Sequence, residues 1–415
     1  MIIQREIYLK KLIERKHNRL VKIVTGIRRC GKSFLLNTLF VAELKRSGIA
    51  DDHIIRLSLE GLMNSKYRDP EFTYHHITSI MRDETMYYII IDEIQMMDRF
   101  VEFLNSLIQI PNADVYVTGS NSRFLSSDIA TEFRGRGDVV QLHPLRFAEL
   151  LSAYDGDKME AWDDYFVYGG MPQILSYKSN ESKAAYLQQL LKNTYIRDLI
   201  ERNKIRNESN LDELLDVIAS VTGSFTNPTK LENTFRSVKQ VSFPRATIDS
   251  YIRYMEDAFL ISKAQKYDVK GKRYIGTPYK IYFEDVGLRN ARLNFRQTEE
   301  NHIMENIIYN DLRTRGFNVD VGIVEYFTKD ENKKTVRKDC EVDFVLNRGS
   351  QRVYIQSAFE IPDAAKMQQE KDSLIHINDS FQKIIITKDF MKPRIDDDGI
   401  VRMGVINFLL DDTII

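Results

Sequence analysis

The chain has 415 residues, of which 43% are hydrophobic and 29% are charged, and its formal net charge is −1. This is the composition of a folded protein with enough apolar residues for several cores, and the length favours two to four domains. A net charge near zero excludes a uniformly basic surface for nucleic acid, so any such surface has to be a local patch.

The cysteines and the apolar runs indicate in which cellular compartment the protein is expected. The two cysteines, Cys30 and Cys340, lie far apart, which excludes a disulfide framework and a cysteine-rich zinc site and suits a reducing compartment. No apolar run approaches the roughly 20 residues that span a bilayer. The N-terminal residues mix apolar and charged types, unlike a signal peptide. We therefore expect a cytoplasmic protein without a membrane anchor.

Up to about residue 150, five short β-rich runs alternate with amphipathic stretches. The runs are LVKIVTG, HIIRLSL, YYIIIDE, DVYVTGS and DVVQLHPL. Strands that are separated by helical segments predict an α/β fold with a parallel sheet and crossover helices.

The first run leads directly into residues 26–33, GIRRCGKS, which match the phosphate-loop pattern GxxxxGK[ST] in full. Glycines let backbone N–H groups turn inward around phosphates, and the following helix directs its positive dipole end at the same anions. In such a loop Lys32 contacts the β- and γ-phosphates of ATP, and Ser33 ligates Mg²⁺. The alternative is a glycine-rich turn that arose by chance. The candidate nucleotide-binding residues are Gly26, Arg28, Arg29, Cys30, Gly31, Lys32, Ser33 and Phe34, with Arg28 and Arg29 either on phosphate or in solvent.

A pair of acids follows the third run. Residues 87–91 are continuously apolar, which predicts a central buried strand, and they lead into Asp92 and Glu93. Ligands bind at the carboxyl ends of strands in open α/β sheets. We expect Asp92 to hold Mg²⁺ through water, beside Ser33, and Glu93 to polarise the attacking water as general base. The alternative is two solvated acids at a strand end.

Two further segments offer polar groups for the γ-phosphate. The fourth strand ends at residue 118, and Asn121, with Ser120 second, is the candidate to reach the phosphate or the water. Arg134 and Arg136 precede the fifth strand and are candidate arginine fingers, which neutralise charge in the transition state. The alternatives are ordinary turn residues and surface arginines. An arginine that acts in trans requires a homo-oligomer.

Beyond residue 150 the pattern changes. Residues 151–206 are expected to be helical, with an interruption at residues 169–172 (GGMP). Between residues 211 and 284, three candidate helices precede a hairpin. A helix is expected at 301–315, followed by strands at EVDFVLN, RVYIQSA and KIIITK. The last part therefore predicts a second α/β unit with its own sheet.

The helices and hairpin of residues 211–285 are consistent with a winged helix, whose third helix would enter a major groove. Basic residues gather in the hairpin, where Asp268 is the single acid among them. Such a patch could contact DNA phosphates. The alternatives are a solvated hairpin or a winged helix that binds protein. The basic residues are Lys263, Lys266, Lys270, Lys272, Arg273 and Lys280.

Taken together, the motifs resemble a known family of prokaryotic ATPases, related to archaeal ATPases. Its members pair an AAA-type P-loop domain (AAA_14) with the C-terminal domain of unknown function DUF4143. The stretches that carry the resemblance are GIRRCGKS, IIIDEIQ, VTGSNSRFLS with EFRGRG, LHPLRFAEL, YGGMP, YIRDL, and EVDFV with YIQSA. The resemblance implies the same roles for Lys32, Ser33, Asp92 and Glu93, and it places Gln95 within the family motif without a chemical role.

The resemblance also implies four parts. An AAA-like core at 1–150 is followed by a helical lid at 151–210, a winged-helix-like domain at 211–285 and a domain similar to PD-(D/E)xK nucleases at 286–415. Glu305 and Asp343 fit two places of a metal-dependent nuclease site. The third strand should then read acid-x-lysine.

At that third strand this chain has Gln356, Ser357 and Ala358 instead, and Glu360 is displaced from the expected place. We therefore expect a degenerate nuclease-like domain that serves binding. The leading functional hypothesis is a Mg²⁺-dependent ATP-hydrolysing switch or motor whose winged-helix-like and nuclease-like parts serve recognition, with DNA as one candidate partner. The alternatives are a nucleotide-gated protein-interaction module with slow hydrolysis and, disfavoured by Gln356 and Ala358, an ATP-dependent nuclease.

Overall fold

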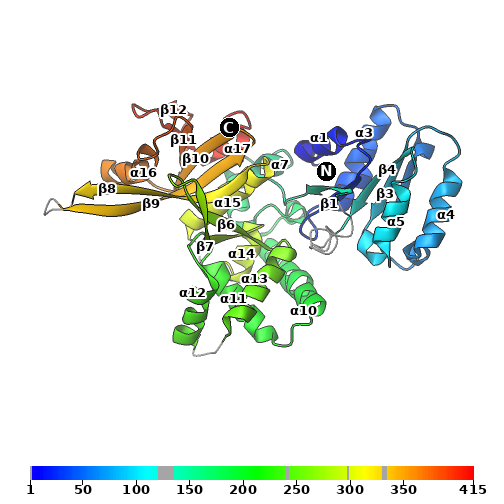
Figure 1. The fold of residues 1–415 in the computed structure, drawn as a ribbon, viewed down its shortest axis with the longest axis horizontal. Helices are drawn as coiled ribbons and strands as arrows, with labels where there is room; N and C mark the ends of the chain where they lie inside the picture. Colours follow the sequence, from blue (N-terminus) through cyan, green and yellow to red (C-terminus); the bar gives the residue numbers. More distant parts are fainter. Residues whose placement is uncertain (1, 120–134, 240–242, 297–298, 330–333) are drawn as a thin grey trace. The chain divides into compact units, whose positions relative to one another are not determined.

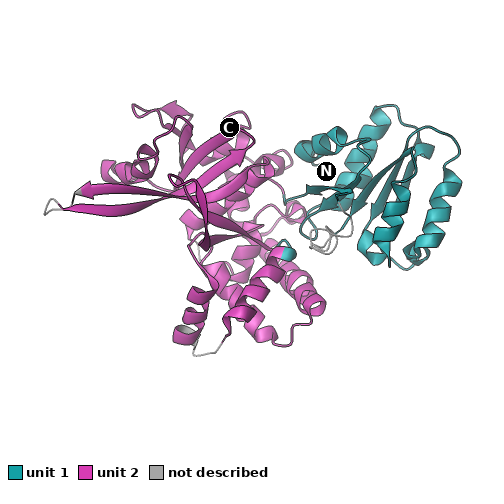
Figure 2. Cartoon of the chain, viewed as in Figure 1, with its two compact units in different colours: residues 1–144, 257–259 teal, residues 145–256, 260–415 magenta. Residues whose placement is uncertain are grey.

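The computed structural model describes residues 2–119, 135–239, 243–296, 299–329 and 334–415. The chain divides into two compact units (Figure 2): unit 1 comprises residues 1–144 and 257–259, and unit 2 comprises residues 145–256 and 260–415. Among the described residues, every helix is too short or too polar to span a bilayer.

Unit 1 is built on a five-stranded parallel sheet in the order β2–β3–β4–β1–β5 (Figure 1). This confirms the predicted parallel sheet and all five strand runs. Strand β4 lies between β1 and β3, so the ends of these three strands meet at one edge. The strands are β1 (Val21–Thr25), β2 (Ile54–Ser58), β3 (Tyr87–Asp92), β4 (Ala113–Thr118) and β5 (Gly137–Gln141).

The central strands of this sheet are apolar because they are covered on both faces. Every residue of β1 and β3 is buried, as expected for a parallel strand between helices. One face packs against apolar side chains of α4 and α5, such as Ile77, Phe103 and Leu104. The main helices of unit 1 are α1 (Glu6–Glu14), α2 (Lys32–Phe34) with its continuations η1 (Leu35–Phe40) and α3 (Val41–Arg46), α4 (Pro70–Ile80) and α5 (Phe100–Leu107).

Unit 2 begins with helices, as predicted for residues 151–206 and for the part of residues 211–284 that precedes the hairpin. The glycine interruption has a packing reason: the N–H of Gly170 donates to the buried Asp285 carboxylate at 2.7 Å, and a Cβ at Gly170 would lie 2.1 Å from the carbonyl oxygen of Leu145. These helices are α7 (Phe147–Leu151), α8 (Lys158–Tyr168), α9 (Asn180–Leu190) with η7 (Leu191–Ile196) and α10 (Arg197–Asn203), α11 (Glu208–Ser220), α12 (Pro228–Thr234) with η8 (Phe235–Lys239), α13 (Arg245–Asp257) and α14 (Val286–Arg292).

The rest of unit 2 is an eight-stranded sheet in the order β12–β13–β11–β10–β9–β8–β6–β7. Its strands are β6 (Ile261–Asp268), β7 (Arg273–Phe283), β8 (Asn318–Lys329), β9 (Thr335–Arg348), β10 (Gln351–Ala358), β11 (Gln382–Thr387), β12 (Arg394–Ile395) and β13 (Val401–Gly404). The remaining helices are α15 (Glu300–Thr314), α16 (Ala364–Ile375) and α17 (Val405–Leu410).

The sheet joins two parts that the sequence suggested were separate. Strand β6 of the predicted wing pairs in parallel with β8, from Lys266↔Val321 to Asp268↔Ile323. The hairpin is therefore the edge of the large sheet and not a free wing, and the boundary expected at residue 285 falls between strands of one sheet. The physical reason is that β6 has backbone N–H and C=O groups along both edges. In an isolated hairpin one of these edges would bond only to water, whereas here it pairs with β8.

Candidate nucleotide site

The loop between β1 and α2 has the backbone that a phosphate loop requires. Gly26 and Gly31 adopt φ values of 139° and 101°, which disfavour any side chain. At Gly26 space is also lacking, because a Cβ would lie 2.0 Å from the carbonyl oxygen of Leu142. Both glycines that the sequence pattern singled out are therefore needed where they stand.

A buried arginine fixes this loop from outside the motif. Arg5, 3% exposed, donates to the carbonyl oxygen of Cys30 at 3.3 Å and to that of His143 at 2.7 Å. The Cys30 thiol, also buried, donates to the carbonyl oxygen of Leu142 at 3.5 Å. Cys30 thus packs the loop against the chain after β5. No sequence motif indicated Arg5, which lies 25 residues before Cys30.

Lys32 lies within the curve of the loop. Its side chain is 5% exposed, and its ammonium donates to the carbonyl oxygens of Gly26 at 3.0 Å and Ile27 at 3.2 Å. A buried ammonium that is held by neutral carbonyls and has no carboxylate among these partners keeps its positive charge available for an anion.

The hydroxyl of Ser33 and the carboxylate of Asp92 meet across the strand ends. Ser33 Oγ donates to Asp92 Oδ1 at 3.0 Å, so the end of β3 lies beside the start of α2, as the sequence predicted. The Thr118 hydroxyl, at the end of β4, donates to the same Asp92 oxygen. An exposed hydroxyl beside a carboxylate is an oxygen pair of the kind that Mg²⁺ prefers.

Glu93 has a strained backbone conformation, and hydrogen bonds to neighbouring residues stabilise it. Its φ of 57° lies in the left-handed region, which is uncommon for residues other than glycine. The Glu93 N–H donates to Thr118 Oγ1 at 2.9 Å, and the Gln95 side-chain amide donates to the Glu93 carboxylate. Gln95, which stood in the family motif without a chemical role, therefore orients this carboxylate. Thr118 was not predicted, because the candidates were taken from the residues after the fourth strand and Thr118 is the last residue of that strand.

The other predicted site residues are not gathered with these. Arg28 is half-buried, Arg29 is exposed, and Phe34 follows Ser33 in the first helical turn. Asn121, Ser120 and Arg134 lie outside the described residues.

Arg136 is described and hydrogen-bonds to Asn105 Oδ1 at 2.8 Å. It precedes β5, whose first residue pairs with Val21 at the start of β1. The phosphate loop follows the other end of β1, about 16 Å away at 3.3 Å per residue. The structure therefore does not bring Arg136 to the nucleotide site of its own chain.

In unit 2, the predicted nuclease-type carboxylates do come together, but around a lysine. Lys280 of β7, 3% exposed, lies 2.6 Å from Glu305 Oε1, 2.5 Å from Glu341 Oε1 and 3.6 Å from Asp343 Oδ1. Burial alone would lower the pKa of Lys280, but the three carboxylates outweigh it and raise that pKa. Burial, followed by the charge of Glu305, raises the pKa of Asp343.

This arrangement corrects the interpretation of Lys280 as an exposed hairpin cation, because its ammonium is enclosed by carboxylates. The third-strand residues contact other parts of unit 2. Ala358 is buried, Gln356 accepts from Ser373 Oγ at 3.4 Å, and Glu360 is exposed and pairs with Lys388. Glu360 therefore does not replace the missing acid.

Two further hairpin cations are neutralised locally. Lys263 pairs with Glu256 at 2.7 Å, and Arg273 pairs with Asp268 at 3.3 Å. The Lys270 ammonium donates to the carbonyl oxygen of Glu325. Cation–carboxylate pairs of this kind weaken the positive potential that a phosphate would meet, so the positive potential of the hairpin is weaker than its composition indicated.

With this geometry in hand, comparison with known proteins identifies the first unit. Residues 18–151 match the family model described as an AAA domain (AAA_14). The chain therefore contains an AAA domain. It belongs to the same family as a Haemophilus influenzae (strain Rd) protein described as uncharacterized, with 32% identity over 415 residues and 99% coverage of each chain. A Methanocaldococcus jannaschii protein, also described as uncharacterized, is 27% identical over 384 residues, which are 89% of this chain and 80% of that protein.

The matched domain of unknown function corrects the family resemblance. Residues 159–299 of this AAA-domain protein match DUF8612, whereas the resemblance implied DUF4143 at the C-terminus. The matched range includes α9 to α14 and the β6–β7 hairpin. Among solved structures, the Walker-type ATPase of Pyrococcus abyssi is similar over 70% of this chain and 96% of that chain, with 16% identity and a TM-score of 0.48.

Proposed function

We propose that this AAA-domain protein hydrolyses ATP with Mg²⁺ and uses the reaction as a switch or motor. The observation that carries the proposal is the Ser33–Asp92 contact of 3.0 Å beside the buried Lys32. It unites a hydroxyl, a carboxylate and an ammonium at the end of a parallel sheet, where phosphates bind.

Each residue has a distinct task in this proposal. The loop N–H groups and Lys32 bind the β- and γ-phosphates, and Ser33 and Asp92 hold the metal. Bound Mg²⁺ would neutralise charge that develops between the β- and γ-phosphate oxygens. Glu93, oriented by Gln95, accepts the proton of the attacking water. Arg136 would have to come from a second copy of the chain in order to stabilise the transition state, because it lies away from the nucleotide site of its own chain.

A pair of variants tests the proposal. Lys32→Ala should abolish or severely weaken binding of a fluorescent ATP analogue, because the loop loses its charge. Glu93→Gln should bind the analogue as wild type does and yet release inorganic phosphate at least 100-fold more slowly, at the lower end of what removal of a general base does. Glu84→Gln, the same change at an exposed position of unit 1, is the matched control and should leave both unchanged. Normal turnover in Glu93→Gln would refute the general-base assignment.

A further inference from the structure

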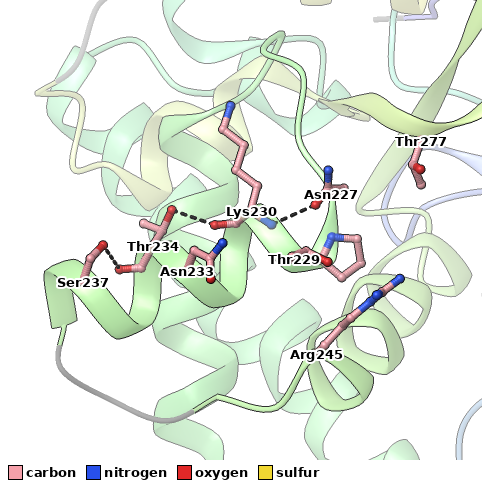
Figure 3. A pocket seen from close by; sticks show the side chains of 9 residues that line it. Asn227, Thr229, Lys230, Asn233, Thr234, Ser237, Arg245 and Thr277 are labelled. Atoms are coloured by element: carbon pink, nitrogen blue, oxygen red, sulfur yellow. Dashed lines mark hydrogen bonds between the residues drawn. The ribbon is translucent and has the colours of Figure 1, made fainter.

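Unit 2 contains a polar hollow of about 770 Å³ that is bordered by α12, the first residue of α13 and β7 (Figure 3). We call it the α12–α13 hollow. Nine side chains line it, namely a lysine, an arginine, three threonines, a serine, two asparagines and a proline. None of these nine is acidic or aromatic.

The hollow has a fixed frame. Thr226 and Tyr279 exchange two backbone hydrogen bonds, of 2.8 and 3.0 Å, which tie the start of α12 to β7. The Asn227 side chain accepts from the N–H of Lys230 at 2.8 Å and caps α12. Helix α13 buries an apolar stripe that includes Ile248 and Ile252, so its orientation is set by the core. The lining residues are therefore presented by elements that are held in place.

Two positive charges border the hollow without a carboxylate partner. The Lys230 ammonium donates to the carbonyl oxygen of Phe225 at 2.8 Å, a neutral group. Arg245 is exposed, and no described residue pairs with its guanidinium. Glu232, the acid of α12, already pairs with Arg236 at 3.3 Å. Both charges are thus available to an anion, unlike Lys263 and Arg273 of the hairpin.

The lining favours one class of partner. Lysine, arginine, serine, threonine and asparagine are the residues that contact phosphate and sugar in DNA complexes. A protein-binding surface would be expected to have an apolar or aromatic centre, and a site for single strands would have aromatic side chains for base stacking. We infer that the α12–α13 hollow binds the sugar–phosphate backbone of duplex DNA.

The surface next to the hollow suits a long polyanion and not a single phosphate. From Thr277, which lines the hollow, the exposed part of β7 runs to the basic turn that contains Lys272. Four strand residues span about 13 Å, which equals about four base pairs of duplex at 3.4 Å each. Duplex RNA is instead recognised through 2′-hydroxyls across two minor grooves, a span far longer than this hollow.

The effect of each cation follows from counterion release. One phosphate contact contributes about 0.9 to the slope of log K against log salt. Loss of that contact therefore weakens binding about 15-fold at 50 mM salt and about fourfold at 200 mM salt. Arg245→Gln and Lys230→Gln should each show this pattern, and the double variant should lower the slope by about 1.8.

The test is the fluorescence anisotropy of a labelled DNA duplex of about 24 base pairs, titrated with the full chain at 50 and 200 mM salt. Arg394→Gln is the matched control, because Arg394 is an exposed arginine on β12, at the opposite edge of the same sheet from β7. It should bind as wild type does. Equal affinities of the Arg245→Gln and Arg394→Gln proteins, or no duplex binding at micromolar protein, would overturn the inference.

Three competitors identify the bound chemistry. An unlabelled DNA duplex should displace the probe, whereas inorganic phosphate at matched ionic strength should not. Tighter binding of single-stranded DNA or duplex RNA would overturn the assignment to duplex DNA, and displacement by inorganic phosphate would reduce the hollow to a small-anion site. The inference does not rest on ATP hydrolysis, because Lys32→Ala should bind the duplex as wild type does even if the nucleotide site fails.

Discussion

Thr118 offers the sharpest test of how the nucleotide site is held. Its side chain is fully buried, its hydroxyl donates to Asp92, and the same oxygen accepts the Glu93 N–H at 2.9 Å. One oxygen therefore positions both acids. Thr118→Val keeps the shape of the side chain and removes only these hydrogen bonds.

The size of the effect follows from the two bonds. A hydrogen bond to a charged group contributes about 1.5–3 kcal/mol, and an unsatisfied backbone N–H costs about 1–3 kcal/mol. Since the two share one atom and are not additive, we expect a loss of about 2–4 kcal/mol in the free energy of unfolding. If a third to a half of that loss appears in the transition state, the barrier rises by about 0.7–2 kcal/mol and turnover falls about three- to thirtyfold, since 1.4 kcal/mol is a factor of ten.

The assay is steady-state release of inorganic phosphate at saturating ATP over a range of Mg²⁺, at a temperature where urea unfolding shows each variant to be folded. Thr118→Ser keeps the hydroxyl and is the control, which should retain most of the activity. A Thr118→Val protein that turns over within twofold of wild type, with the same Mg²⁺ dependence, would show that the hydroxyl does not position these acids.

Three further predictions concern a backbone position and two buried charges. Gly26→Ala should lose ATP-analogue binding at least tenfold, because its Cβ would meet the Leu142 carbonyl oxygen at 2.0 Å, whereas Gly48→Ala, with φ 89° and open space, should not. Burial raises the pKa of Asp285 from 3.8 to about 6, so its contribution to stability is present below about pH 4 and is lost as the pH rises through 6. The unfolding free energy of wild type minus that of Asp285→Asn should fall across this window, and a flat difference would contradict the assignment. Lys280→Met should destabilise unit 2 by about 3–5 kcal/mol in urea unfolding, because three carboxylates lose their cation, and the exposed Lys272→Met should not.

The elements of the nucleotide site that could be predicted are those encoded locally. The phosphate loop follows its strand without a gap, and Asp92 ends an apolar run, so each could be located from a few consecutive residues. Their meeting also follows from the rule that parallel strands end at one edge. The roles of Glu93, Arg136 and the residues outside the described ranges stay predictions.

The supporting residues could not be predicted in this way, because their positions depend on strand order and chain packing. Thr118 contacts Asp92 only because β4 lies between β1 and β3, an order that no local pattern states. Arg5 reaches the loop from the position before α1 and donates to the carbonyl oxygen of His143, 138 residues away. A buried arginine in a charged N-terminal segment looks like any surface arginine in sequence.

Lys280 is a second residue whose surroundings could not be predicted from the sequence. In sequence it stands among hairpin cations, and alternation along an edge strand would place it on a solvated face. In the structure residues 279–283 are all buried, because α15 and β9 supply Glu305, Glu341 and Asp343 on the side that alternation left open. A linear motif asked for a lysine at position 358 and found alanine, while the fold brought a lysine to the same carboxylates from β7. The alanine at position 358 therefore shows that the linear motif is broken. It does not show that the carboxylates lack a lysine, because the fold brings one to them from another strand.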